Sequence, residues 1–207
     1  MMTDKKTTGT AHIEPLGLDE LAEVEDIISI ARQTSGYVPT SMRIMAHKPD
    51  ILRAFGGLIG AIMRTETELP METKWLTAHA VSTSAGCAYC QAHTAANGEK
   101  KGLSADKVQD LLNYRASPLF DDSERGVIEF GLAAGEVPNA TNRSHFDGLR
   151  EHFTEGQIVE MVSVIALFGW LNRWNDTFAS DLEDAPRAFA AEKLADRGWE
   201  VGKHAAE

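Results

Sequence analysis

Apolar residues recur three or four positions apart along most of this chain, which is the spacing that places them on one face of an α-helix. The pattern predicts a helix that ends at Gly36, a second that opens at Pro49 and a third that opens at Pro70. No segment shows the clean alternation of apolar and polar residues that is typical of a β-strand. The expected fold class is therefore all-α.

The small polar run of residues 82–86 is poor helix-forming material, and it interrupts the third helix directly before Cys87. A fourth helix is expected from about Cys87 to Lys101, with Gly102 as its terminator. Ser104 is the expected N-cap of the next helix. Further helices are expected over residues 123–133, 144–153 and 185–195, and a long apolar one is expected after the capping box of Thr154 and Gln157.

Polar residues dominate the first part of the chain, so residues 1–16 are expected to form a flexible arm. Residues 17–207 are expected to form one helical domain. The segment that contains the two cysteines spans about residues 50–115, and a second helical half spans about 120–200. A weak internal echo relates residues 70–101 to 155–180, and it places Asn172 and Asn175 where Cys87 and Cys90 stand. This echo predicts a bundle of two weakly repeated halves.

Acidic residues outnumber basic ones by 31 to 20 among 207 residues, which gives a formal net charge of −11. Such a charge opposes binding to nucleic acid or to an anionic membrane surface. The N-terminus carries no pattern of a signal peptide or lipid anchor, so residence in the cytoplasm is expected. In a reducing compartment, an isolated Cys-x-x-Cys pair indicates redox chemistry or metal binding rather than a structural disulfide.

The segment from Cys87 to His93 contains both cysteines of the chain. At a helix N-terminus, free backbone N–H groups favour the thiolate of Cys87. Cys90 lies one turn further on and can resolve a mixed disulfide or a sulfenic acid. His93 follows Cys90 by another turn, so its ring can take the proton of Cys90 or stabilise its thiolate. The helix dipole by itself favours Cys87 as the more acidic thiol, whereas His93 lies beside Cys90.

Two other interpretations of this segment stay open. The two thiols could be inert members of an apolar core. Alternatively, Cys87, Cys90 and His93 could bind zinc together with a histidine from elsewhere, such as His47 or His79. The expectation adopted here is a redox pair with no metal and no bound cofactor.

The stretch from Ser82 to Ser104, STSAGCAYCQAHTAANGEKKGLS, resembles the core motif of the alkylhydroperoxidase D (AhpD)-like, carboxymuconolactone decarboxylase superfamily. The resemblance covers about residues 50–115, and the segment Phe168–Asp176 is similar to the closing segment of longer, peroxidase-related members. It implies an AhpD-like helical bundle, a homo-oligomer and an antioxidant enzyme that reduces hydroperoxides. It also implies re-reduction by an external dithiol of the thioredoxin or lipoyl type.

Carried over residue by residue, the resemblance makes Cys90 the peroxidatic thiol, Cys87 the resolving thiol and His93 the relay base. The histidine of the family motif falls on Thr94, and its upstream glutamate falls on Trp75. Candidates for the proton relay or the pocket wall are then Glu160, His79 and Tyr89.

Other roles remain open for the chain as a whole. A decarboxylase of muconolactone-type acids shares the fold, but the cysteine pair argues against that lyase. A redox-sensing oligomer without enzymatic activity is the third alternative. In the closing segment, an ion pair between Arg173 and Asp176 is expected to fix the helix.

Overall fold

The computed structural model describes residues 9–64 and 67–205, and every regular element within them is helical, as the sequence predicts. The α-helices are α1 (Glu25–Ser35), α2 (Thr40–Met45), α3 (Pro49–Ile59), α4 (Met71–Ser84), α5 (Ala88–Lys100), α6 (Ala105–Asp110), α7 (Asp122–Gly135), α8 (Arg143–Leu149), α9 (Glu155–Phe178) and α10 (Asp184–Lys193). Shorter helical turns are η1 (Leu18–Glu20), η2 (Ala22–Val24), the π-helical η3 (Gly60–Arg64), η4 (Leu111–Asn113), η5 (Ala195–Arg197) and η6 (Gly202–His204).

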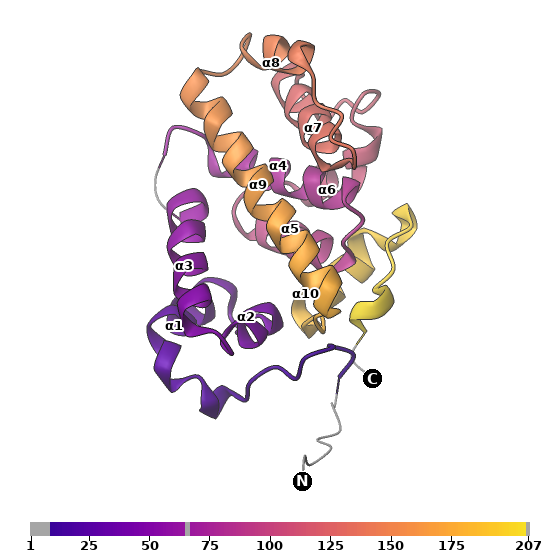
Figure 1. The fold of residues 1–207 in the computed structure, drawn as a ribbon. Coiled ribbons are helices and arrows are strands. Elements are labelled where there is room, and N and C mark those ends of the chain that lie inside the picture. Colours follow the sequence, from indigo (N-terminus) through magenta and orange to yellow (C-terminus); the bar gives the residue numbers. More distant parts are fainter. Residues whose placement is uncertain (1–8, 65–66, 206–207) are drawn as a thin grey trace.

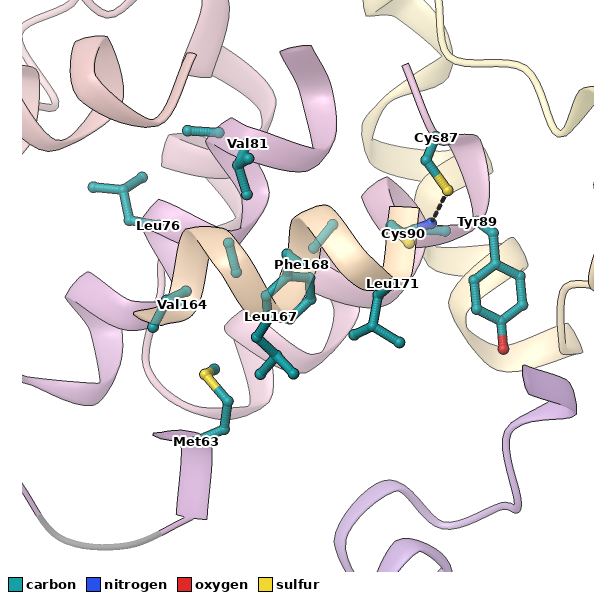
Figure 2. Close-up of a cluster of buried hydrophobic side chains, with 14 of the residues drawn as sticks. Met63, Leu76, Val81, Cys87, Tyr89, Cys90, Val164, Leu167, Phe168 and Leu171 are labelled. Carbon is teal, nitrogen blue, oxygen red and sulfur yellow. Dashed lines mark hydrogen bonds between the residues drawn. The ribbon is translucent and has the colours of Figure 1, made fainter. Parts of the chain in front are cut away.

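The long helix α9 crosses the molecule, with α7 and α8 beside its N-terminal end and α10 beside its C-terminal end (Figure 1). α4 packs against α5, α7 and α9, and α5 packs in addition against α10. One apolar core joins these helices, and Cys87 and Cys90 lie at one end of the part of it drawn in Figure 2. No described helix combines the length and apolar character needed to span a membrane.

The helix ends follow the sequence signals closely. Gly36, directly after α1, and Gly102, two residues after α5, adopt positive φ angles of 87° and 104°, where a side chain would be strained. Ser104 caps α6, and Thr154 and Gln157 form the predicted capping box of α9. The short helix α2 was not predicted. In addition, α9 runs unbroken through the segment that the internal echo aligns with the break before Cys87.

The expected N-terminal arm is only partly described, because residues 1–8 lie outside the described residues. The remainder is attached to the domain. The backbone N–H of Thr10 donates to Asp181 over 2.8 Å, and that of His12 donates to the carbonyl of Phe178, also over 2.8 Å. Ala11 between them is buried. Residues 10–12 are therefore held against the end of α9 and the segment that follows it.

The buried side chain of Lys74 links α4 to the N-terminal half of α9 through an ion pair. The Lys74 side chain is 1% exposed, and its Nζ lies 3.3 Å from Oε2 of Glu160. The same Nζ donates to the carbonyl of Ile62 over 2.7 Å and to Oγ1 of Thr67 over 2.6 Å. Because a buried charge is strongly destabilising without its partner, Glu160 is expected to hold this corner of the fold together.

Glu160→Ala should lower the free energy of unfolding by about 3 kcal/mol, since it leaves the Lys74 ammonium buried without its counter-ion. Chemical denaturation with far-ultraviolet circular dichroism measures this loss. Glu155→Ala, which breaks an exposed ion pair on the same helix, is the matched control and should cost less than about 1 kcal/mol. Equal losses in the two variants would contradict the role assigned to Glu160.

Candidate active site

Cys87 is the N-cap residue of α5. α4 ends at Ser84, Gly86 turns the chain with a φ of 70°, and α5 begins at Ala88. The sulfur of Cys87 then accepts the backbone N–H of Cys90 over 3.4 Å (Figure 2). The helix break predicted from the small polar residues thus places a sulfur where a cap oxygen normally stands.

Beyond the motif, Cys87 has two polar neighbours that come from the C-terminal part of the chain. Its sulfur, a carboxylate oxygen of Asp176 on α9 and a ring nitrogen of His204 in η6 all lie within 4.8 Å of one another. His204 Nδ1 is 2.9 Å from the carbonyl oxygen of Ser180, and Nε2 is 3.3 Å from Oδ1 of Asp176. The imidazole is therefore fixed between a carbonyl, a carboxylate and a sulfur.

These contacts make Cys87 an acidic thiol. The hydrogen bond from the Cys90 side chain is the main cause that lowers the pKa of Cys87 from 9.0 to about 6. Burial opposes the shift, and hydrogen bonds from His204 and from the Cys90 backbone N–H add to it. The pKa of His204 is raised despite its burial, because its contacts with Cys87, Ser180 and Asp176 favour the imidazolium. Cys87 is therefore a thiolate at neutral pH.

Cys90 has the opposite character. Burial is the main cause that raises its pKa well above 9.0, and the adjacent Cys87 sulfur raises it further. A hydrogen bond from Nδ2 of Asn175, 3.6 Å from the Cys90 sulfur, opposes this shift only in part. Cys90 is thus a neutral thiol that donates to the Cys87 thiolate. The position of His93 predicted that Cys90 would be the more acidic thiol, but the lower pKa belongs to Cys87.

His93 belongs to a second polar cluster. Its Nε2 lies 2.6 Å from Oε2 of Glu183, the N-cap of α10, and its Nδ1 lies 3.3 Å from the hydroxyl of Tyr37. Tyr89 stacks on the His93 ring at 4.3 Å between centroids and donates to Glu183 over 3.0 Å. Although burial opposes it, the charge and hydrogen bond of His93 and a backbone N–H of Thr40 lower the pKa of Glu183.

The other two predicted relay or pocket candidates differ in position, since His79 lines the cavity at the start of α5 whereas Glu160 lies far from the sulfurs. The Nδ1 of His79 is 2.9 Å from Oγ1 of Thr94, which donates to the carbonyl of Cys90 over 2.8 Å, so His79 reaches the backbone of Cys90. Burial lowers the pKa of His79 to about 4, which keeps it neutral. Glu160 binds Lys74 and lies fifteen residues before Asn175 on α9, or about 22 Å along the helix.

Sequence reasoning missed Glu183 and His204, and it misassigned Asp176. Asp176 faces His204 and lies 3.5 Å from Nζ of Lys203, whereas Arg173 donates to the carbonyl of Gly169. The expected ion pair between Arg173 and Asp176 is therefore wrong, because the Arg173 side chain turns back along its own helix. The internal echo did point to Asn175. No spacing along the chain pointed to Glu183 or His204.

Cys87, Asp176 and His204 are also the one group of potential metal ligands found among the described residues. Sulfur, nitrogen and oxygen donors at such distances resemble three of the four ligands of a zinc site. His93, which the zinc interpretation of the motif requires, is instead paired with Glu183. The structure therefore does not bring together the zinc ligands expected from the motif, which were Cys87, Cys90 and His93. The potential ligands that it does bring together are Cys87, Asp176 and His204.

A cavity of about 620 Å³ opens beside the thiolate, between the start of α5 and the C-terminal segment. Asp176 and His204 line it, together with apolar side chains that include Trp199 and Leu111 and polar ones that include Gln91 and Arg197. Its mixed lining suits a small organic molecule with an apolar body.

Comparison with known proteins identifies the family. The sequence model of the carboxymuconolactone decarboxylase family matches residues 49–131. The debrominase Bmp8 is 31% identical to this chain. The match covers 86% of this chain and 95% of Bmp8, and the two structures superpose with a TM-score of 0.80. The chain belongs to the AhpD-like, carboxymuconolactone decarboxylase superfamily. Bmp8 has been solved in its apo form and, as a cysteine-to-alanine variant, in complex with 2,3,4-tribromopyrrole.

Two further proteins are similar to most of the chain. A peroxidase-related protein with an alkylhydroperoxidase AhpD core, from Ralstonia eutropha JMP134, is 27% identical over 87% of this chain and 95% of its own, with a TM-score of 0.70. The protein YnjA of Escherichia coli K12, which is uncharacterized, is 24% identical over 164 residues, or 77% of this chain and 90% of YnjA. Family members thus include peroxidase-related proteins and a debrominase.

The wild-type protein should show one thiolate that titrates with a midpoint at about pH 6, read from its ultraviolet absorbance. Because the folded-state pKa of Cys87 is lowered, the thiolate is present above this pH and is lost below it. Cys87→Ala should abolish this titration step. Cys90→Ala should move the midpoint upward by about one unit, since it removes the thiol that donates to Cys87. A midpoint that Cys87→Ala leaves in place would contradict the assignment.

Proposed function

We propose that this protein is a thiol-dependent peroxidase that reduces hydroperoxides through Cys87 and Cys90 and is re-reduced by an external dithiol. The observation that carries the proposal is the contact between the two cysteines at the start of α5, where the Cys87 sulfur accepts the backbone N–H of Cys90 and where the pKa of Cys87 is lowered while that of Cys90 is raised. A thiolate is the reactive form towards a peroxide, and a neighbouring thiol is needed to resolve the product. Membership in a family with peroxidase-related proteins supports this chemistry.

In this proposal Cys87 attacks, which reverses the order implied by the sequence resemblance. The Cys87 thiolate forms an S–O bond with the terminal oxygen of the hydroperoxide, the O–O bond breaks, and the alcohol leaves after taking one proton. Cys90 then attacks the sulfenic sulfur. The disulfide forms, and the hydroxide leaves as water with the Cys90 proton. His93, one turn after Cys90 on α5 and paired with Glu183, is the proposed relay for that proton.

A dithiol of the thioredoxin or lipoyl type would restore the pair by exchange through a mixed disulfide. This step returns one proton and two electrons to each sulfur pair, so one peroxide is consumed for each dithiol oxidised. An antioxidant role and a homo-oligomeric assembly follow from the family and belong to the same proposal.

Cys87→Ser should lower steady-state peroxide consumption by about 1000-fold or more, since it removes the nucleophile. Cys90→Ser should reduce one equivalent of peroxide and stop at a sulfenic acid on Cys87, which dimedone trapping and mass spectrometry can locate. The reverse pattern, with the sulfenic acid on Cys90, would restore the order implied by the resemblance. If the wild-type protein consumed no peroxide with any dithiol, the proposal would be wrong and a redox sensor would be the better interpretation.

The likeness to Bmp8 favours a second candidate function, reductive debromination of a brominated aromatic compound. The same thiol pair could serve it. The Cys87 thiolate would take bromine from carbon as a sulfenyl bromide while the carbon gains a proton. Attack by Cys90 would then release bromide and a proton and form the disulfide. Decarboxylation of a lactone, by contrast, has no use for this pair.

Hydroperoxide consumption should exceed bromide release from 2,3,4-tribromopyrrole at equal substrate and dithiol concentrations, by about tenfold or more if peroxide is the evolved substrate. Bromide release can be followed by ion chromatography in parallel with a peroxide assay. Cys87→Ser is the control that should abolish both. Faster bromide release than peroxide reduction would make the protein a dehalogenase instead.

A further inference from the structure

We propose that His204 is the acid–base residue for Cys87 and that Asp176 is its positioning residue, so that the C-terminal segment completes the catalytic site. This inference rests on the proposed thiol chemistry of Cys87. It assigns the source of the proton that the leaving alcohol requires, a role that neither the motif nor His93 fills in this structure.

The backbone around His204 holds its ring in one orientation. The N–H of Leu182 donates to the carbonyl of His204 over 2.9 Å, and the residue is 1% exposed. Because the carbonyl of Ser180 can only accept, the Nδ1 that faces it at 2.9 Å carries a hydrogen. The other nitrogen, Nε2, is left to face Asp176, and the ring lies against the Cys87 sulfur. Nε2 is therefore the nitrogen that gains and loses a proton.

The charged surroundings favour a proton at this nitrogen. The Cys87 thiolate from the start of α5 and the Asp176 carboxylate from α9 both attract a cationic ring, and Cys90 lies behind Cys87 as a neutral thiol. Lys203 is the cation on the same turn, and its Nζ is itself 3.5 Å from Asp176. The Tyr89 ring, with its centroid 5.7 Å away, adds an uncharged face. Cys87, His204 and Asp176 thus form a cysteine–histidine–carboxylate arrangement, in which a proton can pass between the ring and a group at the sulfur while Asp176 orients the ring.

His204 also borders the cavity. Asp176 and His204 line the cavity of about 620 Å³, whereas Cys87, which lies within 4.8 Å of both, is fully buried and is not among the lining residues. The proposed proton donor is therefore a group beside the sulfur that a molecule in the cavity can contact.

The proton balance closes over one cycle. His204 gives its Nε2 proton to the alkoxide that leaves when Cys87 attacks the peroxide, and it becomes neutral. When the dithiol reduces the Cys87–Cys90 disulfide, its two hydrogens return as the Cys90 thiol and the His204 imidazolium, while Cys87 is released as a thiolate. Asp176 stays ionised throughout and stabilises the cationic ring.

The test compares His204→Gln with His152→Gln, which replaces an exposed histidine on the turn before α9. In His204→Gln, the midpoint of the thiolate titration should rise by about one pH unit or more, and the rate of the first peroxide turnover should fall by about 100-fold. Asp176→Asn should lower the same rate by a smaller factor and Asp176→Glu should restore part of it, whereas His152→Gln should leave both readouts unchanged.

A second variant distinguishes a loss of acid–base function from a loss of folding in the C-terminal segment. In His204→Ala, added imidazole should restore part of the first-turnover rate, which a merely structural role would not allow. An unchanged midpoint and rate in His204→Gln would overturn the inference while the peroxidase remained. A His204-dependent midpoint without any peroxide reduction would overturn the function instead. A midpoint in the wild-type protein that depends on a chelator would show that this trio binds a metal, and it would also overturn the inference.

Discussion

The site depends on one local constraint, the break between α4 and α5 that makes Cys87 a helix N-cap. A helix N-terminus offers backbone N–H groups without partners, and a thiolate accepts them better than a thiol does. The Cys90 N–H and the Cys90 side chain both point at this sulfur from the first turn of the helix. Cys90 is held neutral, first because it is buried and then because a second thiolate beside Cys87 would be repelled.

The C-terminal third of the chain supplies the polar partners of the side chains on α5 and at its N-cap. Asn175 and Asp176 reach the two sulfurs from α9, and His204 lies against Cys87. Glu183, at the start of α10, accepts from His93 and Tyr89. Each ionisable side chain buried on α5 or at its N-cap thus has a polar partner from outside the motif, as buried polar groups require.

The same arrangement explains how one fold can serve different reactions. Proteins similar to this chain include peroxidase-related members and a debrominase. A thiolate beside a neutral thiol can attack an oxygen or a halogen and end as the same disulfide. The cavity beside the C-terminal segment, with Trp199 and His204 in its wall, would therefore decide which molecule reaches the sulfur.

The sequence by itself determined the helical class, most helix boundaries and the position of the reactive pair. These depend on interactions between residues a few positions apart, such as the caps at Ser104 and Thr154 and the break before Cys87. Which thiol carries the charge was decided only by the tertiary structure. The partners of His93 and Cys87 are Glu183 and His204, 90 and 117 positions further along the chain, and burial of such pairs depends on how distant helices pack.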